Sequence, residues 1–274
     1  PTLDRVLDAL LREPALSGIH LAGGEATIRF ERLLDAIALV RSKSVPIDYL
    51  ETNAAWCADR EKTRRKLGLL KDAGLPAILI SCSMFHNEFT PFSYTRNCVE
   101  MAEKVFGHHN VIVWTPNFYQ ALMNMPGHEK AHPIGEFCEQ AGIPQWSASI
   151  PSLYHLTPGG RAPEGLRKCY ESRPWTTFEG LACHRELMNT SHFHIDCYGN
   201  LFTGLCPGIS VGRLDDLHPR ITAGAFPVFS RLCEGGPYEL ARWAVATWDF
   251  CPSGEGYAGK CDLCYQVRRH ISAR

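Results

Sequence analysis

The first half of the chain alternates amphipathic helical segments with short apolar runs. Leu3, Val6, Leu7 and Leu10 follow the spacing of one helix face, and residues 30–38 repeat that spacing. Apolar runs typical of buried strands begin near residues 19, 47, 77 and 111. Because strands that alternate with helices pair in the same direction, this half of the sequence predicts right-handed βαβ units and a parallel sheet, an α/β fold.

A polar segment follows each of the four predicted strands. The carboxyl ends of parallel strands share one edge of the sheet, and α/β proteins bind ligands there. The sequence therefore predicts one shared site at that edge, and His86 is its candidate for an acid or base, with other catalytic residues unassigned. The polar segments are Gly23-Gly24-Glu25, Glu51-Thr52-Asn53, Ser81-Cys82-Ser83 and Thr115-Pro116-Asn117.

The pattern changes after about residue 145, where Gly, Pro, Cys and aromatic residues become frequent. Two short alternating runs flank Tyr198-Gly199-Asn200 and predict a β-hairpin. Helical segments are predicted at 226–233 and 237–246. We therefore expect two domains, an α/β domain over 1–164 and a smaller, irregular α+β region over 165–274.

The charge balance excludes a broad basic surface. The chain of 274 residues has 28 Lys and Arg against 29 Asp and Glu, so binding to nucleic acid is not expected. No apolar run approaches the roughly 18 residues that span a bilayer, and the first residues are not a signal peptide. A cytoplasmic protein without a membrane partner is the expectation.

Twelve cysteines carry the first functional indication. A long chain with a large apolar content and no export signal does not need disulfides, so metal or cluster ligation is favoured. The sharpest motif is Cys261-Asp-Leu-Cys264, whose two thiolates can reach one metal, although a redox pair has the same spacing. Cys183 and Cys206 bracket the predicted hairpin and are the expected further ligands, while Cys197 and Cys251 stay open as alternatives.

Together these motifs resemble the radical S-adenosylmethionine (radical SAM) enzymes. Residues 18–26, which read Gly-Ile-His-Leu-Ala-Gly-Gly-Glu-Ala, resemble the GGEP motif that follows the second strand in that family. Thr52-Asn53 resembles the TNG sequence that closes the third strand. The segment from Cys183 to Cys206, followed by 260–264, resembles the SPASM or Twitch region that binds an auxiliary iron–sulfur cluster.

The resemblance implies a partial (β/α)6 TIM-like barrel that lacks its first strand, followed by a cluster-binding region. Gly23, Gly24 and Glu25 would contact the amino group of SAM, with Asn53 and Ser81 nearby. An auxiliary [4Fe–4S] cluster would be bound by the four cysteines Cys183, Cys206, Cys261 and Cys264.

In such enzymes, reductive cleavage of SAM yields a deoxyadenosyl radical that abstracts a substrate hydrogen. The implied partners are an electron donor such as flavodoxin or ferredoxin and a substrate that the sequence does not identify. A peptide or protein is the favoured substrate class, because relatives with a SPASM region often act on peptides.

The sequence departs from the family in one important respect. The CxxxCxxC loop that binds the catalytic [4Fe–4S] cluster is absent, so that second cluster is expected only where the loop is supplied. We expect an N-terminally truncated chain that is inactive by itself. Ala26 replaces the proline of the motif, which is a smaller departure. A non-catalytic iron–sulfur or zinc-binding module, and a barrel enzyme that uses His86 and Glu25, remain the alternatives.

Overall fold

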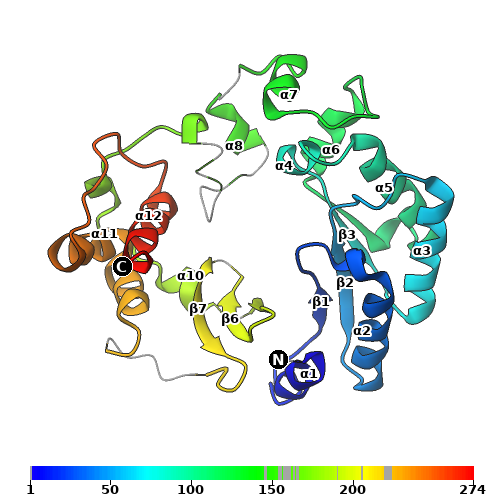
Figure 1. Cartoon of the computed structure of the whole chain (residues 1–274), viewed down its shortest axis with the longest axis horizontal. Coiled ribbons are helices and arrows are strands. Elements are labelled where there is room, and N and C mark those ends of the chain that lie inside the picture. Colours follow the sequence, from blue (N-terminus) through cyan, green and yellow to red (C-terminus); the bar gives the residue numbers. More distant parts are fainter. Residues whose placement is uncertain are drawn as a thin grey trace. The chain divides into compact units, whose positions relative to one another are not determined.

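The structure is a computed structural model, which forms two compact units (Figure 1). The N-terminal unit comprises residues 2–144, and the C-terminal unit comprises most of the described residues from 147 onwards. No described helix is long and apolar enough to cross a membrane. The structure describes residues 2–144, 147–153, 156, 162, 164, 167–189, 191–204, 206–218 and 224–274.

The N-terminal unit contains a four-stranded parallel sheet in the order β1-β2-β3-β4. Its strands are β1 (Ile19–Leu21), β2 (Ile47–Thr52), β3 (Ile78–Ser81) and β4 (Val111–Trp114). Helices connect successive strands, so the predicted α/β alternation is confirmed (Figure 1). The helices of this unit are α1 (Leu3–Leu10), η1 (Ala26–Arg29), α2 (Phe30–Ser42), α3 (Arg60–Ala73), α4 (Met84–Asn87), α5 (Phe92–Phe106), η2 (His108–Asn110), α6 (Pro116–Met123) and α7 (Ile134–Gln140).

Local sequence signals explain where α3 begins and ends. The carboxylate of Asp59 accepts the backbone N–H of Lys62 at 2.8 Å, which caps the first turn. Gly74 ends the helix with φ of 105°, a left-handed conformation that favours glycine. The helix buries Leu67 against Leu50 and Ile78 of the sheet, in one apolar core. This packing fixes the carboxyl ends of β2 and β3.

The C-terminal unit contains a three-stranded antiparallel sheet in the order β5-β6-β7. The first two strands form the predicted hairpin, and the carboxylate of Asp196 accepts the backbone N–H groups of Tyr198 and Asn200 in its turn, each at 2.9 Å. The third strand was not predicted. The strands are β5 (Phe193–Ile195), β6 (Asn200–Thr203) and β7 (Cys206–Arg213), and the helices from residue 147 on are α8 (Ser149–Leu153), η3 (Arg167–Cys169), η4 (Trp175–Phe178), α10 (His184–Met188), α11 (Pro227–Trp248) and α12 (Lys260–Ser272).

Helix α11 joins the two predicted helical segments across a kink at Gly236 and Pro237. Gly236 has φ of 74° and ψ of −166°, which is a region essentially confined to glycine. A Cβ atom at this position would lie 2.0 Å from the carbonyl oxygen of Leu181. The kink therefore lets α11 approach the backbone that leads directly into Cys183.

We expect Gly236→Ala to destabilise the protein by about 1–3 kcal/mol, because alanine must adopt a strained conformation and displace Leu181. Urea unfolding measures the change. Gly254→Ala is the matched control, since a Cβ there meets no atom within 4 Å. Equal stability of the two variants would contradict this account of the kink.

Candidate functional site

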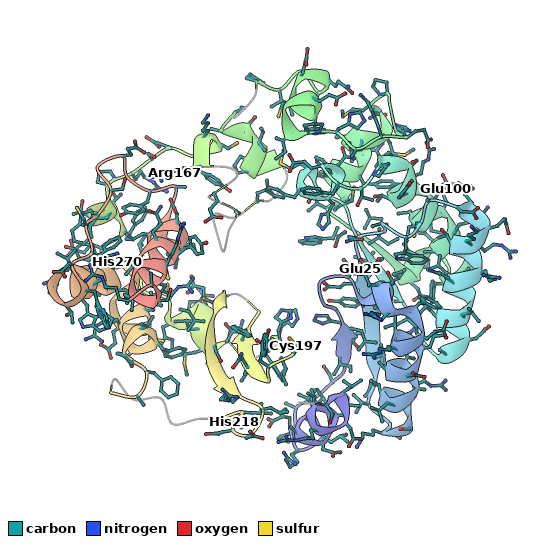
Figure 2. The ribbon with its side chains drawn as sticks, in the orientation of Figure 1. Glu25, Glu100, Arg167, Cys197, His218 and His270 are labelled. Atoms are coloured by element: carbon teal, nitrogen blue, oxygen red, sulfur yellow. The ribbon has the colours of Figure 1, made fainter. Side chains whose placement is uncertain are left out.

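Glu25 is fixed at the carboxyl end of the parallel sheet by hydrogen bonds from two neighbouring segments (Figure 2). Its Oε1 accepts the hydroxyl of Thr52 at 2.9 Å and the backbone N–H of Thr27 at 3.2 Å. Its Oε2 accepts the backbone N–H of Asn53 at 2.7 Å. The segments that follow β1 and β2 therefore meet as predicted, and the carboxylate of Glu25 joins them.

Gly23 and Gly24 leave open space next to their backbone. Both residues are exposed, and a Cβ atom at either position would have no neighbour within 4 Å. Neither glycine is needed to relieve a close contact in the fold. The arrangement therefore leaves the backbone at the end of β1 accessible to a ligand, beside the carboxylate of Glu25.

His86 lies on α4, after β3, and is the predicted acid or base. Its Nδ1 is 2.7 Å from the hydroxyl of Ser83. Burial lowers the pKa of His86, while the negative charge of Glu25 opposes this shift, so the two groups are within electrostatic reach.

The other two predicted residues of this site lie at neighbouring strand ends. Ser81 is the last residue of β3 and lies opposite Trp114. Asn53 follows β2, and its side-chain oxygen accepts the backbone N–H of Ala55 at 2.9 Å.

The four cysteines predicted as ligands lie on three elements of the C-terminal unit. Cys183 precedes α10, where its backbone N–H donates to the carbonyl of Leu232 at 2.8 Å. Cys206 begins β7. Cys261 and Cys264 lie near the start of α12, where a spacing of three residues puts both on one side of the helix. The chain is helical here, and Leu263 and Val267 reach the core at helical spacing. We call these four residues the four-cysteine group.

The thiols of the four-cysteine group interact electrostatically. Burial raises the pKa of Cys183 to about 12, Lys260 opposes this shift, and Cys264 and Cys261 add to it. Burial also raises the pKa of Cys264 to about 11, with smaller contributions from Cys206 and Cys261 in the same direction. Each thiol is therefore within electrostatic reach of at least one other member, although they come from separate elements.

Two cationic side chains lie beside the four-cysteine group. The ammonium group of Lys260 is 2.6 Å from a carboxylate oxygen of Glu186 and donates to the carbonyl of Ala182 at 3.4 Å. The Nε of Arg268 donates to the sulfur of Cys264 at 3.4 Å, and Arg268 lowers the pKa of Cys264. Nearby positive charge favours the thiolate, which is the form that ligates a metal.

A fifth thiol and these charged neighbours were not predicted from the sequence. Burial and the carboxylate of Glu234 raise the pKa of Cys233 on α11, and Cys206 adds a smaller contribution in the same direction. Cys233 follows Leu232, the partner of Cys183, and no spacing motif marks it in the sequence. Cys197 (Figure 2) and Cys251 are exposed, as is Cys261 within the four-cysteine group.

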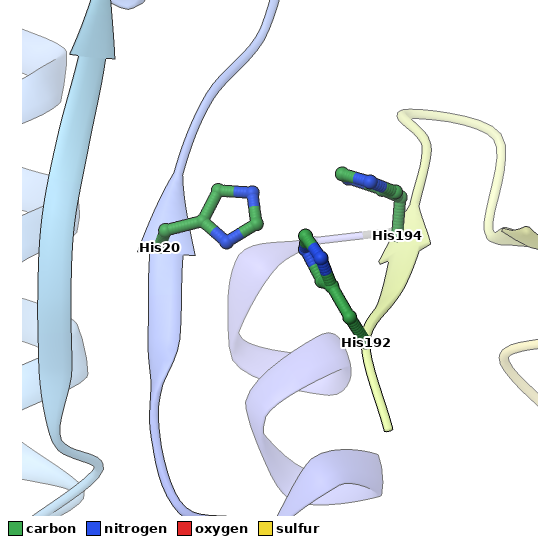
Figure 3. A group of neighbouring side chains, drawn as sticks. All are labelled: His20, His192 and His194. Atoms are coloured by element: carbon green, nitrogen blue, oxygen red, sulfur yellow. The ribbon is translucent and has the colours of Figure 1, made fainter. Parts of the chain in front are cut away.

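A pair of histidines lies on the first strand of the small sheet. The rings of His192 and His194 project from the same side of the β5 segment, with their centroids 4.7 Å apart (Figure 3). His20, also drawn there, belongs to β1 and stacks on Tyr49 at 5.1 Å. Because the pair supplies two imidazoles and a structural zinc site takes four ligands, the pair by itself does not make such a site.

The chain matches no protein-family model and no curated protein. Its function is therefore argued from the strand-end segments of the N-terminal unit and from the four-cysteine group.

Below pH 6.5 we expect the wild-type protein to lose stability that the variant His86→Gln retains. The lowered pKa of buried His86 keeps it neutral in the fold, whereas the unfolded chain takes up a proton below about pH 6.5. Protonation then favours unfolding, so the difference develops as the pH falls from 7 to 5. Urea unfolding across this range measures it, with His109→Gln at an exposed histidine as the control. Parallel pH profiles for the wild type and His86→Gln would contradict the expectation.

Proposed function

We propose that the chain is an iron–sulfur protein of the radical SAM type, whose C-terminal unit binds an auxiliary [4Fe–4S] cluster. The observation that carries this proposal is the four-cysteine group. Three separate elements, the start of α10, the start of β7 and the start of α12, bring these thiols within electrostatic reach of one another. A [4Fe–4S] cluster takes four thiolate ligands, and this group supplies four, which supports the assignment.

The surroundings of the four-cysteine group fit a cluster. Cys264 belongs to the apolar core of the unit, and Cys183 and Cys206 pack against that core, so these three sulfurs are shielded from bulk water, whereas Cys261 is exposed. Lys260 and Arg268 supply positive charge that stabilises thiolates. Burial alone keeps these thiols protonated, and coordination to iron would compensate the cost of deprotonating them.

The strand-end segments support a SAM-binding role for the N-terminal unit. Oε1 of Glu25 is engaged by donors from Thr27 and Thr52, whereas Oε2 accepts the N–H of Asn53. A carboxylate oxygen can accept two hydrogen bonds, so Oε2 has room for an ammonium group such as the amino group of SAM. The open backbone at Gly23 and Gly24 would admit the methionyl part of the ligand, with Asn53 and Ser81 at the neighbouring strand ends.

The sheet supports the finer fold assignment, a partial (β/α)6 barrel. Four parallel strands in sequential order, joined by helices, are the arrangement from which such a barrel is built. Strand β1 forms an edge of this sheet among the described residues, and a sheet edge can pair with a further strand. In the family, that neighbouring strand leads into the CxxxCxxC loop.

In a complete enzyme, SAM and a cluster bound by that loop would supply a deoxyadenosyl radical for hydrogen abstraction. In this chain Glu25 would orient the amino group of SAM, and the four-cysteine group would hold the auxiliary cluster. The proposed partners are a reducing protein such as flavodoxin or ferredoxin and a substrate of the peptide or protein class, in the cytoplasm.

Zinc is the second candidate occupant of the four-cysteine group, because four thiolates also suit a structural zinc site. Anaerobic reconstitution followed by iron, sulfide and zinc analysis separates the two. We expect about four irons and four sulfides per chain, and loss of most of both in Cys261→Ala and Cys264→Ala. Cys251→Ala, at an exposed cysteine, is the control and should retain them. Zinc without iron and sulfide would overturn the cluster assignment.

The 274-residue chain should not cleave SAM. Without the CxxxCxxC loop there is no ligand set for the cluster that donates the electron to SAM. We therefore expect no 5′-deoxyadenosine when the reconstituted chain is incubated with SAM and dithionite, as followed by chromatography and mass spectrometry. Formation of one equivalent per chain would show that this expectation is wrong.

A further inference from the structure

Arg268 connects two of the elements that carry the four-cysteine group. It lies one helical turn after Cys264 on α12, and its Nε donates to the sulfur of Cys264 at 3.4 Å. Its Nη1 donates to the backbone carbonyl of Gly208 on β7. The backbone of Gly208 also lowers the pKa of Cys206, the first residue of the same strand. Arg268 therefore connects the helix that carries Cys264 to the strand that begins at Cys206.

The space for this guanidinium group depends on Gly208. A Cβ atom at residue 208 would lie 2.6 Å from Nη2 of Arg268 and 3.1 Å from Cζ. Those distances are shorter than ordinary van der Waals contact, so any side chain at this position would displace the guanidinium group. The sequence therefore supplies both parts of the contact, the arginine on α12 and the absence of a side chain on β7.

Arg268 differs from the neighbouring cations because no carboxylate of the described residues pairs with it. Lys260 is paired with Glu186 at 2.6 Å. Arg269 is paired with Glu164 at 3.4 Å. Arg268, in contrast, forms no ion pair with a carboxylate of the described residues, and it lowers the pKa of Cys206, Cys261 and Cys264. Its positive charge therefore acts on three of the four thiols.

We propose that Arg268 is a positioning residue that holds the Cys206 strand against the Cys264 helix and raises the reduction potential of the bound cluster. This inference rests on the proposed function. Reduction adds one negative charge to a cluster, and an N–H donor and a positive charge at a ligand sulfur stabilise that added charge. Both act on the reduced state more than on the oxidised state, so the potential rises.

Redox titration of the reconstituted chain, followed by electron paramagnetic resonance, tests the inference. Arg268→Met removes the charge and both donors but keeps an unbranched side chain. The reduced cluster loses a charge-assisted donor and a nearby positive charge, so we expect reduction to become about tenfold less favourable. For one electron, a tenfold change is a shift of about 59 mV to more negative potential.

Three further variants show whether a shift in potential comes from the hydrogen bonds of Arg268, from its position or from net charge. Arg268→Lys keeps the charge without the forked donors and should give a smaller shift in the same direction. Gly208→Ala displaces the guanidinium group and should shift the potential in the direction of Arg268→Met while leaving every charge in the chain unchanged. Arg269→Met removes a charge from the adjacent, exposed position and should leave the potential within error of wild type.

Iron and sulfide content of each preparation separates the possible results. Wild-type chain that binds neither would overturn the proposed function and this inference with it. A loaded wild type whose potential equals that of loaded Arg268→Met would overturn the inference and leave the proposed function standing. If Arg268→Met does not load, Gly208→Ala and Arg268→Lys decide the inference, and unchanged potentials in both would overturn it. An equal shift in Arg269→Met would also overturn it, because the effect would then follow net charge rather than position.

Discussion

Helix α12 packs its apolar side into the core of the C-terminal unit, and the four-cysteine group depends on that contact. Leu263 and Val267 are fully buried there, and each such side chain contributes about 1.5–3 kcal/mol when it leaves water. Cys264 lies between them on the chain and is carried into the same core. Helix α11 and the three-stranded sheet complete this core, so the positions of Cys183, Cys206 and Cys264 follow from apolar packing, and Cys261 is exposed on the same helix as Cys264.

The same packing that assembles the thiols also disfavours their ionisation. Burial raises the pKa of Cys183 and Cys264 to about 12 and about 11, whereas the nearby cations Lys260 and Arg268 act in the opposite direction. Buried thiols of this kind stay neutral unless a metal, as proposed here, compensates the desolvation cost. The parallel sheet stabilises a charged group in another way. Backbone N–H and hydroxyl groups, rather than cations, donate hydrogen bonds to the carboxylate of Glu25.

Much of the fold followed from local signals in the sequence. The four parallel strands and the hairpin before Cys206 were predicted because periodicity and turn residues act over a few positions. Strand β7 was missed because its sequence contains Pro and Gly and has no sustained alternation, so pairing with β6 rather than its own pattern makes it a strand. The helical setting of Cys261 and Cys264 was missed for a similar reason. The spacing CxxC suits a turn and a helix equally, and the buried Leu263 decides between them.

The sequence by itself determined the parallel α/β half, the polar strand ends and the cysteines with ligand-like spacing, because these are patterns of residue type along the chain. The tertiary structure decided which groups meet. It brought Glu25 to the backbone of Asn53, placed Cys233 near Cys206, and set Arg268 between Cys264 and the backbone of Gly208. These contacts join residues from separate elements, and the packing of those elements against a common core determines the distance between them.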